Sequence, residues 1–348
     1  MKLIRHLTLA VSIALGGQAA AEEQIVCTGK NLMPELQQQY PVIAKGMRDE
    51  AAATPYGEGL IWKIEKEGLK PSYLFGTIHL ADPRLLELKP AAQDAFDQST
   101  TLALEITEIL DPKKLAGVAF KALQYTTYTD GTTLSDRLSE EQVELLSAAV
   151  TAKMGLPWSV AGRMKPWALM GTLSIPECEL ARKKALKPVV DAHLGRMAQA
   201  QGKELVALET MISQLQAMDS LPENLSIDGL MESVTLGDRM DDLFETMIQL
   251  YLREKTALVW ALMRRVSQEG FVEAQDNEKY AAFQREIVDR RNYSMVDEAE
   301  KHMAKGGGVF IAVGSLHLPG EKGMINILVQ RGYQVSRVIP KPSHIETK

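Results

Sequence analysis

Two similar peptide segments each place a histidine three residues after a glycine, in Tyr73–Leu80 and in Ile311–Leu318. Each has an apolar run, then Gly, a small hydroxyl residue, an aliphatic residue, His and Leu. A glycine at a strand end permits close backbone approach, so each histidine would leave the strand at a sharp turn. Neutral imidazole is the commonest metal ligand in proteins. A single such histidine would fit a core or loop position, but the matched pair, His79 and His317, favours a metal site.

A carboxylate that ends an apolar strand could complete this set. Glu105 lies near the end of the predicted strand Thr101–Ile106, and buried carboxylates are rare unless paired or bound to a metal. Two imidazoles and one carboxylate suit a divalent transition metal with positions open for water or substrate. The alternative is that Glu105 is an exposed residue past the strand. Glu209 repeats the same context and fits a site or the surface equally well.

An arginine on the apolar stripe of a helix is a further candidate. Arg291 shares a spacing of four with Ile287, Met295 and Ala299, which places it on the inward face of the predicted helix. An inward guanidinium needs a carboxylate, a backbone carbonyl or a substrate oxyanion as partner. A structural salt bridge is the alternative to a role in a reaction.

Two aspartates are weaker candidates for residues of the metal site. Asp82 follows the first histidine on the loop that leaves the predicted site. Asp191 precedes a predicted helix, and we interpret it first as a helix cap and second as a site residue. The sequence contains no Gly-x-Ser-x-Gly, His-Glu-x-x-His or P-loop motif, so serine-hydrolase, zincin and nucleotide-cradle chemistry are not indicated.

The elements that must position these residues alternate between strands and helices. Short apolar runs predict strands at Leu60–Ile64, Tyr73–Ile78, Thr101–Ile106, Leu205–Leu208, Val309–Val313 and Tyr333–Ile339. Helical periodicity predicts helices at Pro90–Gln98, Pro112–Tyr125, Glu140–Met154, Trp158–Leu173, Val189–Ala200, Asp238–Val266, Asn277–Met303 and Met324–Gln330. Ser139 and Gln142 form a capping-box pattern. We expect residues 22–348 to form one α/β domain, a central mixed sheet flanked by helices, with helical insertions around 112–175 and 220–275.

The N-terminus has the pattern of a secretory signal. Lys2 and Arg5 precede the apolar run Leu7–Gly16, and Ala19–Ala21 fits a cleavage site before Glu22. A buried N-terminal helix is the alternative. The 348-residue chain has a net charge of −6, which becomes −8 without residues 1–21. This charge and the lack of a basic stretch argue against nucleic-acid binding, and no later segment is long and apolar enough for stable membrane insertion. We expect a periplasmic or secreted protein.

The chain has two cysteines, Cys27 and Cys178, without metal-site spacing. In an oxidising compartment they could form a disulfide, and two buried free thiols are the alternative.

These segments together resemble the TraB/GumN family, which includes the Tiki-like proteases. The resemblance rests on Tyr73–Leu80 with Asp82 and Pro83, on Leu104 and Glu105, on the stretch from Val190 and Asp191 through Leu208, Glu209 and Thr210 to Gln214, on Arg291 and Asn292, and on Val313–Leu318 with Gly320, Gly323, Gly332 and Tyr333. It implies a fold related to the erythromycin-esterase and ChaN-like proteins, and a divalent-metal hydrolase. His79, His317 and Glu105 match the family's motif residues, and Arg291 with Asn292 its Arg-Asn motif.

The function expected from these observations is a metal-dependent hydrolase of peptides or small molecules, with Mn, Co or Zn as cofactor. His79 and His317 would hold the metal, and Glu105 would be a third ligand or the general base for an activated water. Arg291 would stabilise an oxyanion or orient Glu105. Asp82, Asp191, Glu209 and Asn292 are candidate supporting or substrate-contacting residues. The rival functions are haem or small-ligand binding and a regulatory role without turnover.

Overall fold

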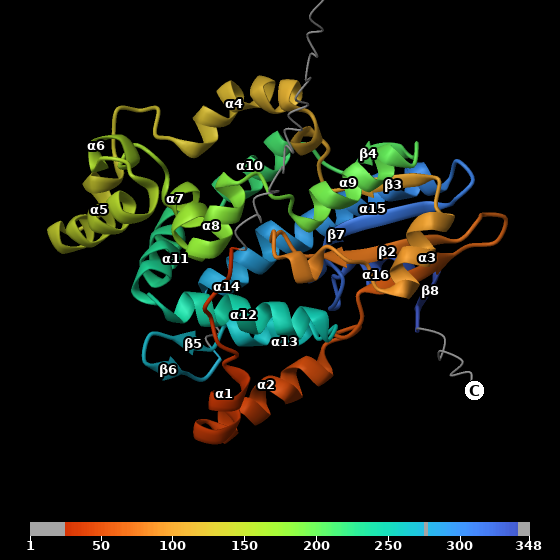
Figure 1. Ribbon diagram of the computed structural model, residues 1–348, viewed down its shortest axis with the longest axis horizontal. Helices are drawn as coiled ribbons and strands as arrows, with labels where there is room; N and C mark the ends of the chain where they lie inside the picture. The colour runs from red at the N-terminus through yellow and green to blue at the C-terminus, as the bar shows by residue number, and fades with distance from the viewer. Residues whose placement is uncertain (1–24, 275–277, 340–348) are drawn as a thin grey trace, which may run out of the picture.

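A six-stranded mixed sheet forms the centre of the computed structural model, which describes residues 25–274 and 278–339. The predicted signal at residues 1–21 and the predicted helix start at Asn277 lie outside these ranges. The spatial order is β4-β3-β7-β2-β1-β8 (Figure 1). The strands are β1 (Ile61–Glu65), β2 (Ser72–Thr77), β3 (Thr101–Leu104), β4 (Glu204–Ala207), β7 (Val309–Gly314) and β8 (Gln334–Arg337). The predicted α/β class with a mixed sheet is confirmed.

Four parallel strands at one side of the sheet bring the two Gly-x-x-His motifs together. β7 lies between β2 and β3 and is parallel to both, and β4 continues the parallel set. Thr77 of β2 pairs with Gly314 of β7, and Leu104 of β3 pairs with Ala312. The residues after these strands therefore meet at one carboxyl edge of the sheet, which is where parallel α/β proteins place their ligands. β2 and β3 are buried along their whole length, as expected for strands covered on both faces.

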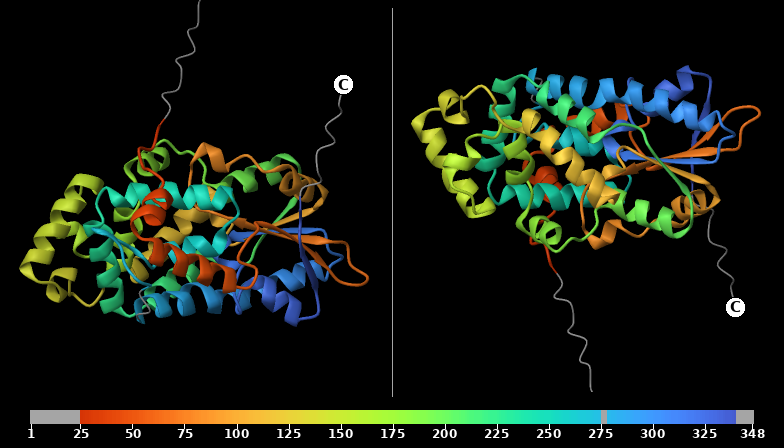
Figure 2. Two further views of the ribbon diagram at one scale, coloured as in Figure 1. Left: turned by 90° about the horizontal axis from the view of Figure 1, so that it is seen from below. Right: turned by 90° about the horizontal axis from the view of Figure 1, so that it is seen from above.

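Helices cover both faces of the sheet. On one face, α3 (Pro90–Gln98) and α9 (Val190–Ala200) bury residues such as Phe96 and Leu194 against Phe310. On the other face, α15 (Arg290–Met303) and α16 (Met324–Gln330) pack against Ile311. Figure 1 shows α3 and α9 in front of the sheet, and Figure 2 shows α15 and α16 on the opposite side. The antiparallel pair β1–β2 and the final strand β8 complete the sheet as predicted.

A helical part lies beside the carboxyl edge of the sheet (Figures 1 and 2). It contains α1 (Met33–Gln39), α2 (Pro41–Ala53), α4 (Pro112–Thr126), α5 (Glu140–Met154), α6 (Trp158–Ala161), α7 (Pro166–Leu173), α8 (Glu177–Lys184), α10 (Met211–Asp219), α11 (Glu223–Thr235), α12 (Arg239–Leu252), α13 (Thr256–Met263) and α14 (Glu278–Phe283), with the hairpin β5 (Val266–Ser267) and β6 (Gly270–Phe271). Ser139 and Gln142 form the predicted capping box of α5.

Two helices predicted as continuous are each broken in the structure. The predicted helix Trp158–Leu173 stops after α6 and restarts at Pro166, because proline disfavours a helical conformation in the residue before it and fits the first helical turn. The predicted helix Asp238–Val266 is divided after α12 at Glu254, whose φ of 61° lies in the left-handed region.

The third long prediction, Asn277–Met303, is helical from Glu278 but changes its winding. Between α14 and α15 the residues Gln284–Asp289 form a π-helical segment, η4. Hydrogen bonds there span five residues, and such segments often occur at functional sites. The sequence pattern gave no sign of this change.

Cys27 and Cys178 form a disulfide that joins the segment before α1 to α8. The bond spans 151 positions, and in the chain-entropy model a loop of that length stabilises the fold by about 5 kcal/mol. No helix in the part of the chain that the structure describes is long and apolar enough to cross a membrane.

Candidate active site

The first histidine of the pair is held by a buried aspartate. His79 follows β2, and its Nδ1 lies 2.8 Å from Asp191 Oδ2, while Thr77 Oγ1 donates to Asp191 Oδ1 over 2.9 Å. Since a carboxylate only accepts, His79 Nδ1 carries a proton and Nε2 is left as the free nitrogen. Asp191 lies in the first turn of α9 but caps nothing, because Val189 is the N-cap residue. Our cap interpretation was therefore wrong: the carboxylate serves two side-chain donors instead.

The second histidine is held by an asparagine. His317 Nδ1 lies 2.6 Å from Asn292 Oδ1. Asn292 Nδ2 donates to the carbonyl oxygen of Lys322 over 2.7 Å, and this contact fixes the amide so that Oδ1 accepts from the imidazole. His317 Nε2 is thus the free nitrogen, as in His79. Metal-bound histidines in proteins typically donate their other N–H to an acceptor in this way.

Both free nitrogens face one oxygen of Glu105. Glu105 Oε1 lies 3.7 Å from His79 Nε2 and 4.0 Å from His317 Nε2. The same oxygen accepts the backbone N–H of Gly314 over 2.7 Å. Glu105 is 5% exposed, so the alternative of a surface residue is wrong.

The other oxygen of Glu105 is bound by two side chains. Arg291 Nη2 donates to Oε2 over 2.6 Å, and Gln214 Nε2 donates over 2.9 Å. Both donors also bind Glu209 Oε2, at 2.8 Å for Arg291 Nη2 and 3.1 Å for Gln214. Arg291 Nη1 donates to the carbonyl oxygen of Ile287. Arg291 thus faces inward, as its helical spacing indicated, and it bridges two buried carboxylates.

Gln214 is a site contact to which the sequence analysis assigned no role. It lies on α10, which begins at Met211 after the side chain of Thr210 caps the helix. Its sequence signals were its place at the end of a stretch that resembles the family and its position five residues after Glu209, and neither signal assigns it a contact with Glu105.

Charges and burial set different protonation states for the three central groups. Burial opposes ionisation of Glu105, but His317, His79 and Arg291 outweigh it and lower its pKa to about 2. The Asp191 carboxylate, which also accepts the Nδ1 proton, raises the pKa of His79 to about 9. Burial lowers the pKa of His317 to about 4, although Glu105 favours its charged form.

The donor set fits a divalent metal ion. Two imidazole nitrogens with their opposite nitrogens protonated, together with a carboxylate oxygen, are ligand types that Mn, Co and Zn accept. Gly314 keeps the space between them open, because a Cβ there would lie 3.3 Å from Glu105 Oε1 and 3.5 Å from His79 Nε2. Beside these groups is a cavity of about 220 Å³, whose wall includes His79, Glu105 and Gln214 and the apolar Ile109 and Val189.

Asp82 lies in a different cluster. Its carboxylate binds Arg84 at 2.9 Å and Arg182 at 3.1 Å, and Arg182 also binds Glu179. The sulfur of Cys27 is near these carboxylates. It is in the disulfide and Arg182 neutralises the acids, so this cluster does not suit a metal. Its contacts fasten the loop after the first Gly-x-x-His motif.

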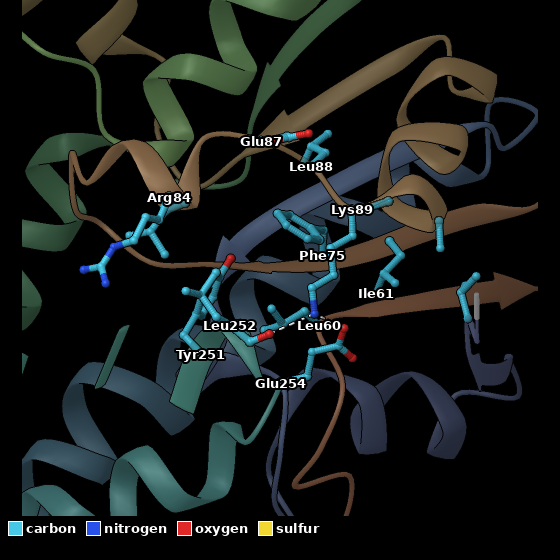
Figure 3. Close-up of a pocket in the computed structure, with 14 residues that line it drawn as sticks. Leu60, Ile61, Phe75, Arg84, Glu87, Leu88, Lys89, Tyr251, Leu252 and Glu254 are labelled. Atoms are coloured by element: carbon cyan, nitrogen blue, oxygen red, sulfur yellow. Dashed lines mark hydrogen bonds and ion pairs between the residues drawn. The ribbon is translucent and has the colours of Figure 1, made fainter. Parts of the chain in front are cut away.

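A second pocket, on the α3 face of the sheet, is too small for a substrate-sized ligand. It measures about 40 Å³ and is lined by residues that include Phe75, Tyr251 and Lys89 (Figure 3). Lys89 donates to the carbonyl oxygen of Leu252 and to Glu254. We therefore assign no function to this pocket.

The fold and these motif positions define a known class of protein. The chain belongs to the TraB/PrgY/gumN family, whose sequence profile matches residues 60–337 and so includes both Gly-x-x-His motifs. It is similar to the Metalloprotease TIKI1 of Danio rerio, with 25% identity over 324 residues. This similarity covers 79% of the present chain, which spans only 62% of that relative's length. No solved structure matches the chain.

Proposed function

We propose that this protein is a metal-dependent hydrolase of the periplasm, most simply a peptidase. The main support for this proposal is that the Nε2 atoms of two imidazoles face one carboxylate oxygen, each within 4.0 Å. Both Nδ1 protons are donated to other acceptors. The similarity to a protein named as a metalloprotease supports the peptidase reaction. The signal-like residues 1–21 support the location.

His79 Nε2, His317 Nε2 and Glu105 Oε1 would hold the ion, with Mn, Co and Zn as the candidates. A divalent ion bound there would supply the Lewis acidity that activates water and polarises a carbonyl group. Asp191 and Asn292 would keep the two imidazoles in the tautomer that offers Nε2. Because the ligand set contains only three protein groups, positions for water and substrate would stay open.

The contacts of Glu105 give its two carboxylate oxygens different roles. Oε2 is fixed by Arg291 and Gln214, so Oε1 is the oxygen available to bind the ion or to accept a proton from the attacking water. Arg291 uses its Nε, Nη1 and Nη2 groups on Glu209, Ile287 and Glu105. We therefore assign Arg291 to orienting Glu105 rather than to stabilising an oxyanion.

The test uses the mature chain with its disulfide intact. Metal is removed by chelation, Mn, Co or Zn is restored, and cleavage of a mixed peptide library is followed by mass spectrometry. We expect cleavage only with restored metal, and its loss in His79→Ala and His317→Ala. His193→Ala, on α9 and outside the site, is the matched control and should cleave normally. Cleavage that survives chelation and both site variants would contradict the proposal.

The two rival functions give different results in the same preparation. A haem-binding protein would show a Soret band on haem titration and no cleavage. A regulatory protein would bind no metal and would retain its partner after both histidines were replaced.

A further inference from the structure

A cavity of about 270 Å³ lies within the helical part, and none of the groups around Glu105 lines it. Its wall comes mainly from α11, α12, α13 and α14 and is nearly all apolar. Met240, Met247 and Met263 contribute flexible thioether side chains. Trp260 and Phe283 stack on one another with ring centroids 5.9 Å apart. A large apolar cavity with few polar groups is the usual form of a small-molecule site.

The polar side chains on this wall are almost all occupied. The hydroxyls of Ser174 and Ser233 donate to backbone carbonyl oxygens of their own helices, and Glu232 pairs with Lys279. Ser226 differs: it is 4% exposed, and its hydroxyl has no hydrogen-bond partner among the described residues. The oxygen of this hydroxyl is itself closed off from the cavity, so it offers a bound molecule no polar contact.

The wall chemistry decides what kind of ligand fits. A peptide segment would bring an N–H and a C=O group for every residue, and the polar groups that the described wall presents to it already have partners. An unbranched aliphatic chain brings no such groups, and methionine-rich walls adapt to its shape. The side chains of Glu232 and Lys279 are 28% and 17% exposed, so this pair marks the end of the cavity that is nearer to solvent. A carboxylate head could there share the Lys279 ammonium group with Glu232.

We propose that this cavity binds the aliphatic chain of a fatty acid, with the carboxylate beside Lys279. The chain would replace water over a wall of methionine, leucine and aromatic side chains, and burial of this apolar surface would drive binding. The site is separate from the Gly-x-x-His centre and does not depend on the function proposed for it.

The test measures binding of cis-parinaric acid, a fluorescent polyene fatty acid, to the delipidated full chain. We expect saturable binding of one probe molecule per chain, with fluorescence energy transfer from tryptophan to the bound probe. In Trp260→Phe this transfer should fall while the affinity for the probe stays the same. Leu225→Trp and Met247→Trp fill the cavity from facing helices and should weaken binding at least tenfold. Leu123→Trp, on the exposed side of α4, is the matched control and should bind as the unmodified chain does.

Circular dichroism and thermal unfolding verify that each variant is folded. The proposal would be overturned if folded Leu225→Trp and Met247→Trp bound the probe as tightly as the unmodified chain does. It would also be overturned if the unmodified chain showed no saturable binding. If neither Leu225→Trp nor Met247→Trp folds, Trp260→Phe alone decides. Unchanged energy transfer to the probe in that variant would overturn the proposal, and loss of the transfer would support it. A capped apolar peptide that displaces the probe more effectively than palmitate does would also overturn it.

Discussion

The two Gly-x-x-His motifs share a backbone arrangement but differ in what surrounds the imidazole. His79 is held by a carboxylate and its side chain is 59% exposed, whereas His317 is held by an amide and is 7% exposed. The pKa of His79 is raised to about 9 by Asp191, and the pKa of His317 is lowered to about 4 by burial. At neutral pH and without metal, one imidazole is therefore charged and the other is neutral.

This difference shows that the motif and its partner have separate tasks. The glycine and the strand end set the position of each ring, and a residue far along the chain accepts its Nδ1 proton. The pKa is set by that partner for His79 and by burial for His317. Asp191 is 112 positions from His79, and Asn292 is 25 positions from His317. A charged His79 also balances Glu105 and Asp191 when no metal is bound.

The largest expected effect comes from removing each ring. His79→Ala and His317→Ala should both lower metal affinity by more than a hundredfold, because each removes one of three donors. His317→Ala should destabilise the fold more than His79→Ala does, by about 1–3 kcal/mol, because it leaves Asn292 Oδ1 unpaired in a buried place. Removal of the exposed His79 ring instead lets water reach Asp191 Oδ2. Calorimetric metal titration and denaturant unfolding of the metal-free protein measure the two effects. Equal destabilisation by both variants would contradict the contrast in burial.

Changing the partner rather than the ring should have a smaller effect. Asp191→Asn is expected to weaken metal binding about 10–100-fold, as is usual for groups that orient a ligand. It should also bring the pKa of His79 down toward its ordinary value, because the carboxylate is the main cause of the shift. Asn292→Asp should raise the pKa of His317 and make the two motifs alike. NMR titration of the imidazole C–H signals measures both pKa values. An unchanged pKa of His79 in Asp191→Asn would contradict the role of Asp191 in raising it.

The pH dependence of metal binding follows from the first ring. The metal binds the neutral imidazole, so below a pKa of about 9 it must displace a proton from His79. We expect metal affinity to rise by up to about tenfold per pH unit across the neutral range and to level off near pH 9. In Asp191→Asn the metal affinity should level off at a lower pH. A flat affinity between pH 6 and 9 in the unmodified chain would contradict a protonated His79.

The smallest effect concerns the glycine between the donors. Gly314→Ala places a Cβ 3.3 Å from Glu105 Oε1, which requires a slight shift of that oxygen, and at an ordinary contact distance of 3.5 Å from His79 Nε2. We expect a loss of about 1 kcal/mol in metal binding, roughly fivefold, with little change in stability. Gly117→Ala on α4 has open space around the new Cβ and is the control. Unchanged affinity in Gly314→Ala would mean that the metal lies away from this glycine.

Local patterns predicted the strands of the six-stranded sheet, the two motif histidines and the inward face of Arg291, but not the hairpin of β5 and β6, whose first residue, Val266, was predicted as helical. These features depend on periodicities of two and four residues and on glycine at strand ends, which a single sequence shows. The role of Asp191 was misread because a first-turn aspartate resembles a cap until its distant partners are known. Gln214 was assigned no role for a similar reason: its contacts with Glu105 and Glu209 form only when α10 lies beside the sheet edge. The break at Pro166 was visible in the sequence, and our prediction gave too much weight to the apolar periodicity around it.

The π-helical segment η4 has a consequence for the length of this chain. It joins α14, whose Phe283 lines the aliphatic cavity, to α15, whose Arg291 and Asn292 orient Glu105 and His317. A π-helical turn holds about one residue more than an α-helical turn, so η4 takes up an extra residue while its two ends keep their rotational phase. Deletion of a single residue between 284 and 289 would restore α-helical winding and leave Phe283 and the Arg-Asn pair with their partners, whereas an insertion would turn one of them away. This stretch should therefore tolerate the loss of one residue far better than the gain of one.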